Sequence, residues 1–271
     1  MINSCIHLLM INKYLRLFCL FRKISFMKLS EYRSDFFFWT LISTMWTAFN
    51  FFFFALLINL NQNIAGWGEW QLYLLLSVFT MLDAATWSIM GDNMWQYTND
   101  IFSGRLSVLL LKPIDFQFAV MTQSNTFNNL PRFFIGLFAL IYSANQLKLS
   151  LSLTQVALFI LSFLSAFLMI YLLWFIVATL AFHVERLDNI NEIVPSLRRI
   201  WQLPRSIYSG IFSTIFTVII PIGLAVSIPS EIILGQSYNW TWYLIFWTLG
   251  LFLFSRAFVK FSLKKYTSVG S

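Results

Sequence analysis

Charged residues are scarce in this chain. They make up 11% of its 271 residues, whereas 59% are hydrophobic, and the mean hydropathy is +0.73. Soluble domains carry about 25% charged and about 45–50% apolar residues. A fold in water cannot bury so large an apolar fraction, so lipid must form part of the solvent around this protein. The net charge of +7 is spread between apolar runs instead of forming one basic face, which excludes a nucleic-acid partner.

The residues that carry most enzyme chemistry are also few. The chain has two cysteines and two histidines, and their spacing matches no metal site. The phosphate-binding pattern GxxxxGK[ST] is missing from the sequence, as are HExxH, CxxC and GxSxG. We therefore expect no catalytic residue, no metal and no cofactor bound by this chain. ATP hydrolysis on a P-loop of its own is excluded.

Six apolar stretches are long enough, or nearly so, to cross the hydrocarbon core of a bilayer, which takes about 20 residues of helix. They predict an all-α polytopic membrane protein. The expected spans are residues 36–60, 70–90, 127–146, 151–183, 207–228 and 241–260. Residues 1–35 then form an N-terminal segment and residues 261–271 a tail, on either side of a transmembrane domain over 36–260.

The basic residues predict the orientation of these spans. With six spans, residues 1–35, 91–126, 184–206 and 261–271 share one face, and all but one of the 18 Lys and Arg residues lie on or near it. The exception is Lys148. Because cytoplasmic flanks collect Lys and Arg, this face and both termini are predicted to be cytoplasmic.

Charged and apolar residues interleave over residues 13–36, ahead of the first span. This pattern is typical of an amphipathic helix that lies along the membrane interface with its basic groups toward anionic headgroups. The other interpretation is an ordinary positively charged flank that only orients the first span. We expect the interfacial helix.

Two prolines, Pro221 and Pro229, interrupt the apolar stretch IIPIGLAVSIPSEIILGQ at 219–236. Proline disrupts a helix interior, yet the stretch is too apolar for a free loop. We expect a broken or re-entrant piece that dips back toward the membrane. Irregular backbone is tolerated at membrane depth only where it is buried in protein or lines a cavity, so the two prolines mark a candidate gate.

One acid, Asp83, stands inside a predicted span, and such a group is by default a candidate functional residue. No basic residue is expected at the same depth of another span, and a proton-coupled carrier usually offers more than one such group. We therefore favour a structural role for Asp83, as a hydrogen-bonding partner of a neighbouring helix. The alternative is a secondary transporter or channel that uses Asp83, which predicts buried charged pairs or an internal repeat with interrupted helices.

The stretch FSGRLSVLLLKPIDF at 102–116 falls in the predicted cytoplasmic loop after the second span. It turns at Gly104–Arg105, continues through a leucine run and stops at Lys112–Pro113, because proline cannot continue a helix interior. So apolar a loop is typical of a contact surface for a cytoplasmic partner. The alternative is that Arg105 and Lys112 are only charges that orient the spans.

Three stretches together resemble the permease subunits of type-2 ABC exporters, a family that includes drug, lipid and polysaccharide exporters. EYRSDFFFW at 31–39 is similar to that family's junction between an interfacial helix and the first span. SGRLSVLLLKP at 103–113 resembles its loop after the second span. LPRSIYSGIFSTIFTVIIPIGLAVSIPSEIIL at 203–234 resembles its fifth span and the broken segment that follows.

The resemblance implies an integral protein of the bacterial inner membrane that forms the export path for an apolar or amphipathic substrate. A separate ABC ATPase subunit would use ATP and Mg²⁺, and a second permease, identical or related, would complete the unit. The family's coupling helix would fall at 97–106, with residues 184–205 as a second contact. The residues implied in ATPase coupling are Asp100, Phe102, Gly104, Arg105, Leu106, Lys112 and Pro113. Those at the junction after the interfacial helix are Glu31, Tyr32 and Arg33.

Overall fold

The protein is all-helical, as predicted. The computed structural model describes residues 2–31, 33–60, 64–184, 189–236 and 238–266, with side chains from residue 12 onward. Within these ranges the chain forms helices, turns and one isolated bridge between Ile64 and Trp67.

Four helices in the described part of the chain are long and apolar enough to cross a membrane. They are α2 (Arg33–Leu60), the continuous helix Glu69–Phe102, α8 (Leu153–Thr179) with its short extension to Phe182, and α13 (Tyr238–Ser262) with its extension to Lys265. A fifth helix, α7 (Leu130–Gln146), covers the third predicted span with 17 residues. It carries Pro131 in its first turn, where a proline displaces no hydrogen bond.

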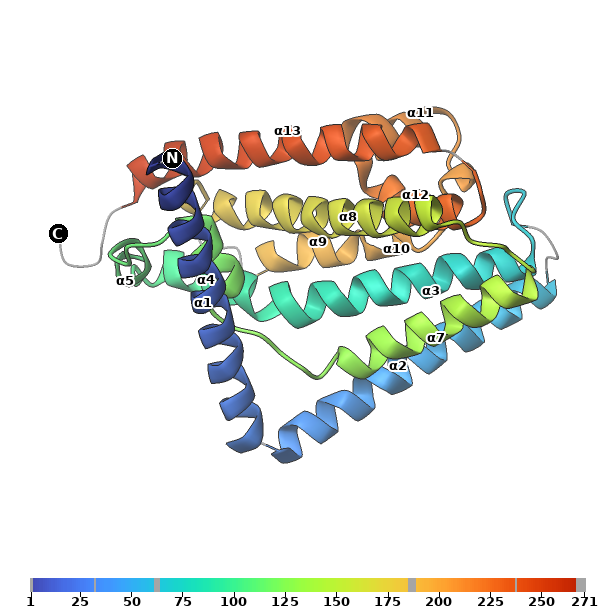
Figure 1. Ribbon diagram of the computed structural model, residues 1–271, viewed down its shortest axis with the longest axis horizontal. Coiled ribbons are helices and arrows are strands. Elements are labelled where there is room, and N and C mark those ends of the chain that lie inside the picture. The colour runs from blue at the N-terminus through green and yellow to red at the C-terminus, as the bar shows by residue number, and fades with distance from the viewer. Residues whose placement is uncertain (1, 32, 61–63, 185–188, 237, 267–271) are drawn as a thin grey trace.

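The helices form a bundle around α3 (Glu69–Thr86) and α8 (Figure 1). In α3 every residue from Leu74 to Ala84 is buried, whereas α2 and α13 present long rows of exposed aromatic side chains to their surroundings. A helix that is apolar on all sides belongs in the centre of such a bundle, and one with a single packed face belongs at its edge. The α1 helix (Ile2–Glu31) crosses the end of the bundle, next to α4 (Asp92–Phe102) and the end of α13 (Figure 1).

The second predicted span does not stop at residue 90. The α3 helix passes through one π-helical segment, Trp87–Gly91, directly into α4. The predicted loop at 91–126 therefore begins as a helical extension of α3, within the most buried of the four long helices described above. Helical backbone thus connects the end of α4 to α3 throughout.

The fifth predicted span, 207–228, is not a single helix. Residues Gly210–Ile219 and Pro221–Ile233 are two helical pieces bent by 83°. The break comes directly before Pro221, as predicted, but Pro229 lies inside the second piece, in α12 (Leu224–Ile233). All ten residues of α12 are buried, mainly against α8 and α3, and this burial stabilises the helix in spite of its proline.

The chain reaches α11 (Gly210–Thr214) through the bundle and not around its end. Asn191 donates a hydrogen bond to Thr98 of α4, over 2.5 Å, whereas the Ser206 hydroxyl donates to the carbonyl of Ala65 in the connection between α2 and α3, at the other end. Between them lie α9 (Ile193–Ser196) and α10 (Arg198–Trp201). The interpretation of 184–206 as a loop on the face of 91–126 is therefore wrong for the described residues 189–206.

A glycine sets the approach of α7 to α3, the most extensive helix contact in the described structure. A Cβ atom at Gly136 would lie 2.8 Å from Cγ of Met81 and 3.0 Å from the carbonyl oxygen of Ser77. Small residues at such positions let two membrane helices pack backbone to backbone.

We expect Gly136→Val to separate α7 from α3 and to destabilise the protein by about 1–3 kcal/mol, the range for overpacking. Thermal unfolding in detergent measures the effect. The matched control is Gly250→Val on α13, where a Cβ meets nothing within 4 Å. Equal shifts in Tm for the two variants would contradict the close α3–α7 contact.

Candidate functional site

The turn after α4 requires a residue with positive φ. The helix ends at Phe102, the Ser103 N–H donates to the carbonyl of Asn99, and Gly104 then adopts a φ of +66°. Glycine reaches this left-handed region without the Cβ clash that other residues meet. The predicted turn at Gly104 therefore has a backbone reason, and it redirects the chain into the segment 103–115, which we call the α5 loop.

The α5 loop exposes apolar side chains. It contains the single-turn helix α5 (Ser107–Leu110). Leu106 and Leu109 are buried, with exposed fractions of 0% and 6%, so they anchor the loop to the protein. The side chains of Val108 and Leu111 point away from the protein and are 66% and 84% exposed.

Side chains distant in sequence hold this loop in place. The Tyr266 hydroxyl donates to the carbonyl of Gly104 over 2.6 Å and accepts from the Ser107 N–H over 3.1 Å. At the other end of the loop, Lys13 Nζ donates to the carbonyl of Pro113 over 3.0 Å, and the Asp115 N–H donates to the Tyr14 hydroxyl over 3.1 Å. Both contacts come from α1, which therefore packs beside the loop.

Asp115 is the third attachment point of the loop. Its carboxylate pairs with Arg256 of α13 and accepts from the Phe118 N–H over 3.0 Å, which caps α6 (Phe116–Thr122). Burial alone would raise the pKa of Asp115, but the hydrogen bonds from Arg256 and Phe118 outweigh it and hold this pKa below its usual value. The pair thus stays charged at neutral pH.

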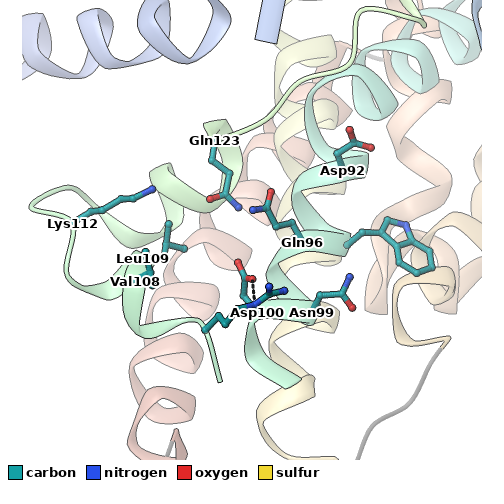
Figure 2. A pocket seen from close by; sticks show the side chains of 10 residues that line it. Asp92, Gln96, Asn99, Asp100, Val108, Leu109, Lys112 and Gln123 are labelled. Atoms are coloured by element: carbon teal, nitrogen blue, oxygen red, sulfur yellow. Dashed lines mark ion pairs between the residues drawn. The ribbon is translucent and has the colours of Figure 1, made fainter. Parts of the chain in front are cut away.

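A cavity of about 550 Å³ opens between α4 and the α5 loop (Figure 2). Asp100 and Arg105 line it as an ion pair, with 3.8 Å between carboxylate and guanidinium, and Figure 2 shows Gln96 and Gln123 directed toward one another above that pair. Lys112 also lines the cavity. The cavity is open on one side, and both polar and apolar side chains line it.

The structure thus brings the seven residues implied in coupling into one region. Asp100, Arg105 and Lys112 line the cavity, Gly104 makes the turn, and the Pro113 carbonyl binds Lys13. Phe102 is half-buried. Glu31 and Arg33 are exposed where α1 meets α2, and Tyr32 lies outside the described residues.

A second polar cluster lies inside the bundle, around Asp83. Arg132 of α7 binds the Asp83 carboxylate with Nη2–Oδ2 at 2.5 Å, and Arg198 of α10 approaches it with Nη1–Oδ1 at 3.3 Å. Arg132 Nε also donates to Thr47 of α2 over 2.8 Å. The expectation that no basic residue shares the depth of Asp83 is therefore wrong, because α7 starts well inside the bundle and α10 passes through it.

A further buried acid was missed by the sequence analysis. Glu231 of α12 is 4% exposed and is held by Arg205 in a bidentate pair, with nitrogen–oxygen distances of 2.7 and 3.0 Å. The Arg205 guanidinium also lies over the ring of Trp240, 4.3 Å from its centroid. The sequence feature that could have indicated this site is a glutamate within the apolar stretch 219–236. The gate was predicted there from the two prolines alone.

The described part of the chain contains no group of three His, Cys, Asp or Glu side chains able to hold a metal ion. In family comparisons, the model described as ABC-2 family transporter protein matches residues 44–270. No curated protein and no solved structure matches the chain.

We expect Asp83→Asn to lower the free energy of unfolding by about 3–5 kcal/mol, because it leaves Arg132 buried without an anion. Thermal unfolding in detergent measures the loss as a lower Tm. The control is Asp100→Asn, whose partner Arg105 is 71% exposed and whose pair contributes about 0–1 kcal/mol. Equal Tm values for the two variants would show that the Asp83 cluster does not hold the bundle together.

Removal of one hydroxyl tests the attachment of the α5 loop. Tyr266→Phe deletes both hydrogen bonds to the loop while keeping the ring, so amide hydrogen exchange over residues 104–111 should accelerate while that of α3 stays unchanged. Tyr142→Phe, at an exposed ring on α7, is the matched control. Unchanged exchange in Tyr266→Phe would mean that Tyr266 does not hold the loop, and that its buried leucines and its other attachments do.

Proposed function

The chain belongs to the ABC-2 family of transporter proteins, and on that premise we propose that it is the membrane-spanning permease subunit of an ABC exporter, driven by a separate ATPase subunit. The observation that carries the proposal is the α5 loop. It presents Val108 and Leu111 to the outside beside the Asp100–Arg105 pair, and three attachments hold it in a defined position. An exposed apolar surface on a fastened loop is typical of a protein–protein contact.

The coupling that we propose depends on the continuity of α3 and α4. A partner that binds the α5 loop acts on the end of α4, and the helix carries this displacement to α3 and its Asp83 cluster. ATP binding by the partner shifts the population of permease conformations only if the loop is held differently in the two states. ATP and Mg²⁺ stay with the ATPase subunit.

We propose six passes through the membrane, with the irregular segment 190–207 as the fifth in place of 207–228. The termini, α1 and the α5 loop then lie on one side, in the cytoplasm. Basic residues support this orientation even without those inside the bundle: Lys13, Arg16, Lys23, Lys28, Arg105, Lys112, Lys260, Lys264 and Lys265 all belong to that end. A second permease, as homodimer or related heterodimer, and a place in the bacterial inner membrane complete the proposal.

A secondary transporter that uses Asp83 is the second candidate, and the buried pairs at Asp83 and Glu231 are a feature that it also requires. To carry a proton, however, Asp83 would have to release two arginines that join three helices. Membership of the ABC-2 family favours the ATP-driven permease.

We expect a P-loop ATPase to co-purify with the wild-type protein from native membranes and to be lost from Leu111→Glu. The substitution puts a charge on an apolar contact without disturbing the buried anchors of the loop. The control is Leu153→Glu, at an equally exposed leucine (87%) in the first turn of α8, where an acid is well tolerated. Mass spectrometry of the purified complex identifies the partner.

Retention of the ATPase by Leu111→Glu would contradict the docking role of the α5 loop. The absence of any P-loop ATPase from the wild-type preparation, together with uptake or efflux driven by a pH gradient, would favour the carrier that uses Asp83.

A further inference from the structure

A groove of about 880 Å³ lies between α2 and the short helices α9 and α10. One wall is aromatic: Trp46, Phe49 and Phe53 lie on a single face of α2, and their side chains are 49%, 58% and 47% exposed. The opposite wall carries Arg198 and Arg199. The volume is within the range of about 300–1,000 Å³ found for small-molecule sites.

The groove lies beside the middle of the bundle. Gln202 Nε2 donates to Asn50 Oδ1 over 2.9 Å, near the centre of α2, and Arg198 reaches Asp83 within α3. Asn50 lies among aromatic side chains of α2, which are suited to contact with lipid. A positive charge is costly at this depth unless an anion accompanies it.

Positive charge exceeds negative charge around the groove. Asp83 is shared by Arg132 and Arg198, so one carboxylate faces two guanidinium groups. Arg199 is exposed, and none of the residues that the structure describes forms an ion pair or hydrogen bond with it. Glu192 is the one acid among the described lining residues. Three arginines thus face two carboxylates, and the excess cation sits in the groove.

We propose that the groove binds an amphipathic anion, a molecule with one anionic headgroup and an alkyl chain. The headgroup pairs with Arg199 and the free edge of Arg198, because guanidinium groups bind phosphate and carboxylate oxygens in a bidentate manner. The chain lies along Trp46, Phe49 and Phe53. Charge complementarity selects this occupant over a neutral or cationic one. That the bound molecule is the cargo rests on the proposed function as a permease.

Direct binding tests the inference on the permease alone. The full chain is placed in phosphatidylcholine nanodiscs without ATP, and bound tritiated dodecyl phosphate is counted against competition by unlabelled dodecyl phosphate, dodecanol and dodecyltrimethylammonium. We expect saturable binding that dodecyl phosphate displaces and that the alcohol and the cation do not. Arg199→Gln should weaken it at least about tenfold, as for the loss of a charge-assisted hydrogen bond. Arg199→Lys keeps the charge but loses the bidentate geometry, so it should weaken binding less than Arg199→Gln does.

The control is Lys260→Gln, which removes one exposed charge on α13, away from the groove. Equal competition by dodecanol, or unchanged binding in Arg199→Gln, would overturn the inference. So would an efficient disulfide between two copies of Arg199→Cys, because the groove would then be closed by a second copy. Since ATP and ATPase are absent, this test fails or succeeds independently of ATPase co-purification, which tests the proposed function.

Discussion

The ion cluster at Asp83 is the constraint on which the arrangement of this bundle depends. A carboxylate that is 3% exposed among apolar helices is stable only with cations and hydrogen-bond donors around it. Arg132 brings α7 to α3 and, through Thr47, to α2. Arg198 brings the segment between α8 and α11 into the bundle, although that segment is too polar and too broken to insert by its hydropathy.

A second buried ion pair stabilises the bundle toward its opposite end. Arg205 and Glu231 form a bidentate pair, and the Ser227 hydroxyl accepts from the Arg205 N–H over 2.9 Å. These contacts fasten the broken piece Pro221–Ile233 against the connection from α10. Irregular backbone needs such internal partners in an apolar environment, and the burial of all of α12 provides the rest. Two buried acids thus hold the segment from α9 to Arg205 and the broken piece Pro221–Ile233 in the bundle.

Hydropathy predicted the long helices well. The helices α2, Glu69–Phe102, α8 and α13 each exceed the about 20 residues of a span, and a helix satisfies its own backbone groups in lipid. Hydropathy failed for residues 189–206. Their arginines have the pattern of a cytoplasmic flank, and the sequence alone does not show that buried acids bind them. The α5 loop was recognised from its glycine, leucines and proline. The sequence did not predict its attachments to Tyr14, Tyr266 and Arg256. Each of them joins residues more than 100 positions apart, and residue spacing carries no signal for such contacts.

Continuity links these features into one account. In the proposed mechanism, the fastened α5 loop, the continuous helix Glu69–Phe102 and the Asp83 cluster connect an exposed apolar surface to the groove beside α2, so that binding at one would shift the other. Site-specific photo-crosslinking in native membranes tests this most directly, with a photoreactive residue at position 111 or, for comparison, at position 153. The account predicts a crosslink from position 111 to a P-loop ATPase and none from position 153. No ATPase crosslink from position 111, or the same crosslink from both positions, would contradict it.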